Sequence, residues 1–137
     1  MGLTVFDAGV LIGFLDRNDA HHASAVRAMR DALSRGDRLG VPASAYAETL
    51  VGPFRSGAAA VATVRRMHDR VPIEVEPLDR DIASAAADLR ARHPALKLPD
   101  ALVIATASVL NADVLITTDR RWPSRKKLGL HATIAQL

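Results

Sequence analysis

Five short apolar runs alternate with longer segments of helical periodicity, and this order restricts the fold more than any other feature of the chain. Strands are expected at residues 3–6, 38–41, 73–75, 114–117 and 132–134, with helices between them. Alternating strands and helices imply a parallel sheet that carries helices on both faces. The runs are mostly apolar and do not alternate with polar residues along their length as half-exposed strands do, which is typical of strands covered on both sides. The sequence therefore predicts an α/β fold with a short parallel central sheet.

Capping residues, glycines and prolines set the expected helix boundaries. A first helix is expected over residues 8–15, and Asp19 and Gly36 are the expected N-cap and stop of the second. Pro42 is expected to open the third helix, and Gly52-Pro53 to end it. Further helices are expected at about residues 58–69, between Asp79 and Pro94, and at about residues 100–110.

The composition favours one domain over residues 1–137. Hydrophobic residues make up 49% of the chain but aromatic residues only 4%, so alanine, valine and leucine must build the core. The absence of cysteine excludes disulfides, thiolate zinc sites and cysteine nucleophiles, and it fits a cytoplasmic protein. Neither a signal peptide nor a membrane span is expected, since the apolar stretch over residues 101–118 contains Ser108, Asn111 and Asp113. A net charge of +3 permits a polyanionic partner such as RNA.

Two aspartates stand where expected strands end. Asp7 directly follows the first strand, and Asp119 lies just past the fourth. Ligands of parallel α/β sheets bind at the carboxyl ends of the strands, so both carboxylates are expected at the binding edge. Each also has a purely structural interpretation, Asp7 as a helix N-cap and Asp119 as a turn residue.

Two further acids lie on expected helices. Asp100 follows Pro99 at the start of a helix that is apolar on nearly every face, so its carboxylate is expected in the interior or in a cleft. It would also complement the helix dipole there. Glu48 lies beside the apolar stripe of its helix, on the same face as Ser44. The alternative for Glu48 is a boundary residue exposed to water.

Four carboxylates that converge would repel one another and raise each other's pKa. A divalent cation removes this conflict, and oxygen ligands select hard cations, so Mg²⁺ or Mn²⁺ is favoured over zinc. Such an ion activates water, orients a phosphate and stabilises charge on a displaced oxygen, as phosphodiester hydrolysis requires. Asp7, Glu48, Asp100 and Asp119 are thus the candidate catalytic and metal-binding residues.

The segments that carry these acids resemble the PIN-domain ribonucleases, and among them the VapC-type toxins of toxin–antitoxin pairs. The resemblance covers essentially the whole chain, in order. Its most specific segment is LPDALVIATA, which begins at Leu98. The other segments are DAGVLI from Asp7, the single residue Glu48, and TTDR from Thr117.

The resemblance implies a three-layer α/β/α fold, a Mg²⁺ or Mn²⁺ cofactor and endonucleolytic cleavage of RNA. It also implies a homodimer and a cognate antitoxin that blocks the site. The four acids would form the family's acidic quartet, with Asp7 and Asp100 as direct metal ligands and Glu48 and Asp119 as direct or water-mediated ones. Thr117 matches a threonine that the family often has two residues before its last acid, and its hydroxyl is expected to contact a metal ligand. Ser44 is a second such candidate.

One position departs from the resemblance. The family often has serine, threonine or asparagine two residues after the first aspartate, and this chain has Gly9 there. The chain therefore lacks a polar side chain at a position close to the expected site.

Basic residues follow the fourth acid. Arg120, Arg121, Arg125, Lys126 and Lys127 either bind phosphates or form a solvated surface segment. Arg120 and Arg121 are the better-placed candidates for RNA binding, together with Lys97 near Asp100. Trp122 either stacks on a base or packs a short turn. His21 and His22 do not share a helix face, which favours ordinary helix-start residues over a metal site.

Two other functions compete with the ribonuclease. A phosphatase that uses Asp7 as nucleophile usually needs a second aspartate two residues later, where Gly9 stands. A catalytically silent RNA-binding or antitoxin-binding PIN-like domain would have no physical need for four converging acids. The sequence therefore predicts a metal-dependent endoribonuclease, the toxin of a type II toxin–antitoxin pair.

Overall fold

The computed structural model describes all 137 residues and confirms the five expected strands, two with the expected boundaries and three with ends that differ by one or two residues. The strands are β1 (Leu3–Phe6), β2 (Arg38–Pro42), β3 (Ile73–Glu76), β4 (Val114–Thr117) and β5 (Thr133–Gln136). The helices are α1 (Ala8–Leu15), α2 (His22–Ser34), α3 (Ala43–Ser56), α4 (Ala58–Asp69), α5 (Arg80–Arg92), α6 (Leu98–Val109) and α7 (Arg125–Leu128).

All five strands are parallel and lie in the order β3-β2-β1-β4-β5. The chain moves outward from β1 to β3, crosses to β4 on the other side of β1, and ends at β5. Ligands of open α/β sheets bind at the carboxyl ends of the strands where this order reverses, which here is between β1 and β4. Asp7 directly follows β1 and Thr117 is the last residue of β4, so both flank this point.

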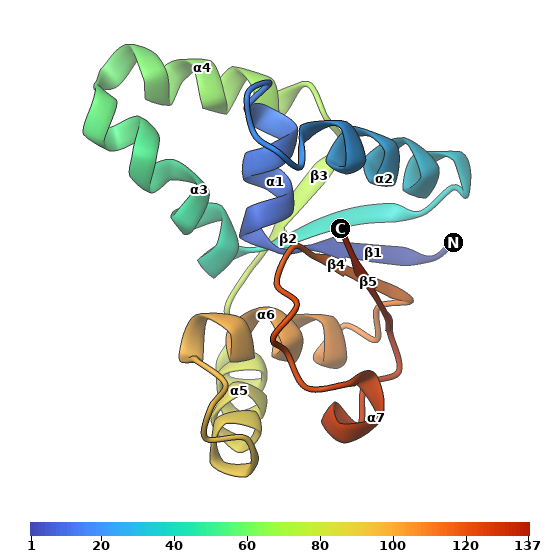
Figure 1. The fold of residues 1–137 in the computed structure, drawn as a ribbon. Coiled ribbons are helices and arrows are strands. Elements are labelled where there is room, and N and C mark those ends of the chain that lie inside the picture. Colours follow the sequence, from blue (N-terminus) through green and yellow to red (C-terminus); the bar gives the residue numbers. More distant parts are fainter.

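The sheet lies between two layers of helices. Figure 1 shows α1 to α4 on one face of the sheet and α5 to α7 on the other, which confirms the three-layer α/β/α arrangement. Right-handed crossovers explain the division, because the helices change face when the chain reverses direction across the sheet. The central strands are fully buried, as Val5, Phe6 and Leu115 show, and Ala101 and Ala105 let α6 approach the sheet closely. None of the helices has both the length and the apolar character that a membrane crossing needs.

The third helix is longer than expected. The expected stop at Gly52-Pro53 was wrong, since α3 continues through Pro53 to Ser56. Proline in the last turn removes only one backbone hydrogen bond, which the packing of a long helix tolerates. The helix ends instead at Gly57, whose φ of 124° is a backbone conformation that favours glycine.

Two other local expectations differ from the structure. Asp19 is not the N-cap of α2, because the helix begins at His22 and the Asp19 side chain accepts the His21 N–H at 2.8 Å in the preceding turn. The short helix α7 was not expected within the basic run. It begins after Ser124, whose hydroxyl accepts the N–H of Lys127, and ends at Gly129 in the left-handed conformation.

Candidate active site

Four separate elements carry the four acids to the carboxyl edge of the sheet. Asp7 caps α1, Glu48 lies on α3, Asp100 lies in the first turn of α6, and Asp119 follows β4. Their charges act on one another: Asp100 and Asp119 raise the pKa of Asp7, and Asp7 and Asp100 raise the pKa of Glu48. The structure therefore brings together the four acids that the sequence selected.

Asp7 is the most constrained of the four. Its Oδ1 accepts the N–H of Ala8 at 2.7 Å, its Oδ2 accepts the hydroxyl of Thr117 at 2.7 Å, and its own N–H donates to the carbonyl of Ile116 at 2.9 Å. Asp7 is thus the N-cap of α1, as the structural interpretation expected, and it also lies among the other acids. Burial raises its pKa, and the hydrogen bonds from Thr117 and Ala8 oppose that rise.

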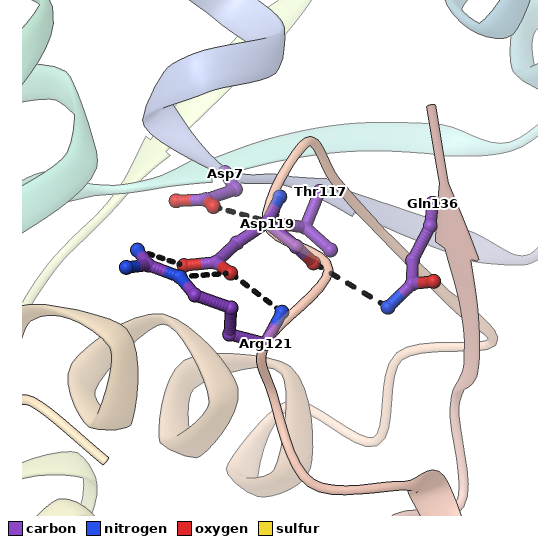
Figure 2. A network of polar contacts seen from close by, with 5 residues as sticks. All are labelled: Asp7, Thr117, Asp119, Arg121 and Gln136. Atoms are coloured by element: carbon purple, nitrogen blue, oxygen red, sulfur yellow. Dashed lines mark hydrogen bonds and ion pairs between the residues drawn. The ribbon is translucent and has the colours of Figure 1, made fainter. Parts of the chain in front are cut away.

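Thr117 joins the ends of β1 and β4. Its hydroxyl donates to Asp7 and accepts the N–H of Asp119 at 3.0 Å, and the side chain is completely buried. Figure 2 shows this hydroxyl between Asp7 and the backbone of Asp119. Thr117 thus contacts a candidate metal ligand, as the sequence predicted, and Ser44 makes no side-chain hydrogen bond to any of the four acids.

Arg121 holds the carboxylate of Asp119. Its Nε lies 3.3 Å from Oδ1 and its Nη2 lies 3.2 Å from Oδ2, and its backbone N–H also donates to Oδ1, at 2.8 Å. These bonds lower the pKa of Asp119, in contrast to the other three acids (Figure 2). Gln136 of β5 donates to the Asp119 carbonyl at 3.4 Å. Arg121 therefore neutralises an acid in this structure instead of standing free for RNA.

Asp100 and Glu48 are less constrained. Burial, and then the charge of Asp119, raises the pKa of Asp100, while Trp122, Arg121 and Lys97 lower it. The indole nitrogen of Trp122 is buried near Asp100, although no bond of good hydrogen-bonding geometry joins them. Glu48 is exposed on α3 and makes no hydrogen bond, so its side chain is free to turn.

The four acids have the ligand chemistry that a hard cation prefers, but in this structure their side chains are too far apart to bind one ion together. All four groups offer carboxylate oxygens, which Mg²⁺ and Mn²⁺ prefer. Burial, and then the negative charge of neighbouring acids, raises the pKa values of three of them. No three His, Asp or Glu side chains stand close enough together to hold one ion. Shared coordination would therefore require rotation of side chains such as Glu48 or the release of Asp119 by Arg121.

Gly9 leaves room for another polar side chain. A Cβ at this position would stand only 2.2 Å from Oγ1 of Thr118, which means that the Thr118 hydroxyl fills the space beside Gly9. The hydroxyl of Thr118, the residue after β4, thus occupies the place that a polar side chain at residue 9 would take. No feature of the sequence pattern pointed to Thr118.

The remaining candidates have separate positions. Lys97 is close enough to lower the pKa values of Asp100 and Asp119, whereas Arg120 is exposed and forms no ion pair. His22 Nδ1 lies 2.8 Å from the Gly13 carbonyl, so this histidine ties α2 to α1, as the interpretation as a helix-start residue suggests. Trp122 is only 8% exposed and is therefore a packing residue in the wall of the site, which excludes an open stacking platform.

The sequence profile of the PIN domain family matches residues 4–128. The chain belongs to the PIN domain family. This match covers all four acids, and it leaves out residues 1–3 and the last nine residues, which include β5. A comparison with curated proteins found no significant match.

Several solved structures with this fold are toxins or toxin–antitoxin complexes. VapBC2 from Rickettsia felis, bound to a promoter DNA fragment, is similar with a TM-score of 0.72 and 11% identity, over 98% of both chains. VapC20 from Mycobacterium tuberculosis, a toxin that cleaves the sarcin–ricin loop, is similar with a TM-score of 0.69 and 17% identity. The comparison covers 86% of this chain and 91% of VapC20. A toxin–antitoxin complex from Klebsiella pneumoniae contains a chain that is similar with a TM-score of 0.64 and 23% identity. The comparison covers 86% of this chain and 88% of that one. At these identities the likeness shows the fold.

Thr117→Val should lower the free energy of unfolding by about 1–3 kcal/mol, because buried Asp7 Oδ2 and the Asp119 N–H each lose a partner. Thr117→Ser keeps the hydroxyl and should lose clearly less. Urea denaturation at neutral pH measures both variants. Equal stability of the two variants would show that the hydroxyl does not hold the site together.

Asp100→Asn should stabilise the protein in EDTA at neutral pH. Because the pKa values of Asp7, Glu48 and Asp100 are raised, the folded chain keeps protons on these groups at pH values where the unfolded chain has already lost them. The contribution of these three carboxyl groups to the free energy of unfolding therefore falls as the pH rises from the ordinary carboxyl range through the raised pKa values. Removing one acid relieves this repulsion, and the advantage should vanish below that range. Melting temperatures across pH measure the effect.

Asp81→Asn is the matched control for that experiment. Asp81 also lies in the first turn of a helix, but on the exposed start of α5 away from the acid cluster. It should give no gain at neutral pH. An equal gain from Asp81→Asn, or none from Asp100→Asn, would contradict the electrostatic description of the site.

Proposed function

We propose that this chain is a metal-dependent endoribonuclease of the VapC type, the toxin of a type II toxin–antitoxin pair. The observation that carries the proposal is the convergence of Asp7, Glu48, Asp100 and Asp119 from four elements, with the pKa raised at three of them. Like charges held together at a cost in stability are typical of functional sites. Membership of the PIN domain family and the fold shared with toxins support the same activity.

The proposed cofactor is Mg²⁺ or Mn²⁺. Asp7 and Asp100 would be its direct ligands, and Glu48 and Asp119 would complete its surroundings directly or through water. When bound, the ion lowers the pKa of a water molecule and stabilises negative charge on the phosphodiester. Oxygen ligands alone make zinc a poor match.

The chain's own residues would orient these groups. Thr117 and the Ala8 N–H use one lone pair on each Asp7 oxygen, which fixes the carboxylate plane and leaves further lone pairs for a ligand. Arg121 stands over Asp119 and is free to move, since its side chain is 81% exposed. It would balance the charge of a substrate phosphate that displaces it from Asp119.

The phosphatase alternative is not favoured by the geometry of Asp7. A nucleophilic carboxylate needs an exposed oxygen whose negative charge is not shared with hydrogen-bond donors. Both Asp7 oxygens are instead engaged in short hydrogen bonds, and the residue is only 9% exposed. Asp7 is therefore better suited to hold an ion than to attack a phosphate.

The proposed partners are an RNA substrate, a cognate antitoxin and a second copy of the chain. Apolar side chains are exposed on α1 and α3, among them Phe54 at 61%, Val51 at 47% and Ile12 at 38%. Clustered apolar surface of this kind marks protein contacts. These side chains support a protein partner on the helical arm of α3 and α4 that Figure 1 shows beside α1.

The test of the proposed function is cleavage of structured and single-stranded RNA by the purified chain with Mg²⁺, with Mn²⁺ and with EDTA. Asp100→Asn should abolish cleavage, since the site loses a ligand, whereas Asp81→Asn should cleave as the unaltered chain does. Gel analysis of labelled RNA ends measures the cut sites. Binding of RNA without cleavage under any of the ion conditions would favour the silent binding domain instead.

A further inference from the structure

A cavity of about 540 Å³ adjoins the acid cluster, and it extends from Asp100 and Asp119 to residues that contact none of the four acids. It lies between the connection from α5 to α6 and the segment that follows β4. Asp100 and Asp119 form its inner rim. Its other polar lining residues are Arg92, His93, Lys97, Arg121, Trp122 and Lys127. The cavity is therefore a basic chamber that opens directly onto the acids.

Two of the four cations in this chamber have no partner. Arg121 is bound to Asp119, and Arg92 pairs with Asp88 at 2.9 Å. Lys97 and Lys127 form neither a hydrogen bond nor an ion pair through their side chains, and they come from two separate segments of the cavity wall, the residue before α6 and the helix α7. Their positive charge is available to a ligand.

Two ring nitrogens in the cavity wall are also unsatisfied. Trp122 is more than nine-tenths buried, and its Nε1 lies near Asp100 without a hydrogen bond of good geometry. The buried Nε2 of His93 has no hydrogen-bond partner. The indole N–H is a donor only, and a buried donor without an acceptor costs about 1–3 kcal/mol. Such groups are rare in folded proteins unless a ligand or water completes them.

We propose that this chamber binds the RNA phosphate next to the bond that is cut, with Lys97 and Lys127 as its counter-charges and Trp122 and His93 as hydrogen-bonding groups. The inference rests on the proposed function, because it assumes that the phosphodiester at the acids is part of an RNA chain. An RNA backbone that reaches the acids continues past the rim of the chamber. The chamber thus holds the flanking nucleotide in place while the acids act on its neighbour.

The chain offers a direct probe of this chamber, because Trp122 is its only tryptophan. The experiment titrates a single-stranded RNA oligonucleotide into the protein in EDTA, so that no cleavage occurs, and follows Trp122 fluorescence beside RNA anisotropy. The unaltered chain should change its emission in step with RNA binding. Lys97→Ala and Lys127→Ala should each weaken binding several-fold and reduce the slope of log affinity against log salt by about 0.7, the value of one single-strand phosphate contact.

Lys126→Ala is the matched control. Lys126 is the neighbour of Lys127 on α7, has the same charge and exposure, and does not line the cavity. It should leave the fluorescence change and the salt slope as they are. Circular dichroism melts confirm that all three variants fold.

The proposal is overturned if RNA binds without changing Trp122 emission, or if Lys126→Ala reduces the salt slope as much as Lys127→Ala does. Because RNA binding is measured without metal, the two proposals can fail separately. If the chain does not cleave RNA with Mg²⁺ but passes this binding test, the proposed ribonuclease function is rejected and the RNA-binding role of the chamber is retained.

Discussion

The hydrogen bond from Thr117 to Asp7 is the contact on which the candidate site depends. It joins the carboxyl ends of β1 and β4 at the point where the strand order reverses. The same hydroxyl accepts the N–H of Asp119, and the other oxygen of Asp7 caps α1. One buried contact thus sets the direction of the first helix, the start of the loop after β4 and the position of two acids.

Three of the acids lie close to other negative charges, whereas the charge of the fourth acid is balanced by an arginine. Burial and neighbouring charge raise the pKa values of Asp7, Glu48 and Asp100, whereas Arg121 lowers that of Asp119. The fold tolerates the repulsion because the strands below the site are completely buried and strongly paired. A cation that is shared by the acids would turn this repulsion into attraction.

The sequence was most informative where one local rule decides the outcome. Apolar runs of about four residues located all five strands, and the rule for the edge of a parallel sheet selected Asp7 and Asp119. Helix ends were harder to predict, because Gly52-Pro53 and Gly57 are both plausible stops and only the packing of α3 decides between them. Glu48 could be selected only through the family resemblance, since an exposed helical glutamate has no local signal.

Contacts made by the loop after β4 were beyond prediction. The pairing of Arg121 with Asp119, the burial of Trp122 against the site and the four-residue helix α7 all depend on how this loop folds back. A basic run in sequence shows charge but not which cations remain free. The structure separates Arg121, which is paired, from Lys97 and Lys127, which are not.

The central claim is that the four carboxylates form one cation site, and calorimetric titration with Mn²⁺ tests it most directly. Titrations in buffers of different ionisation enthalpy also count the protons that binding releases. The account predicts saturable binding with proton release that grows as pH falls toward the raised pKa values, and loss of both in an Asp7→Asn, Asp100→Asn double variant. Unchanged binding in that variant, or no binding by the unaltered folded chain, would contradict the account.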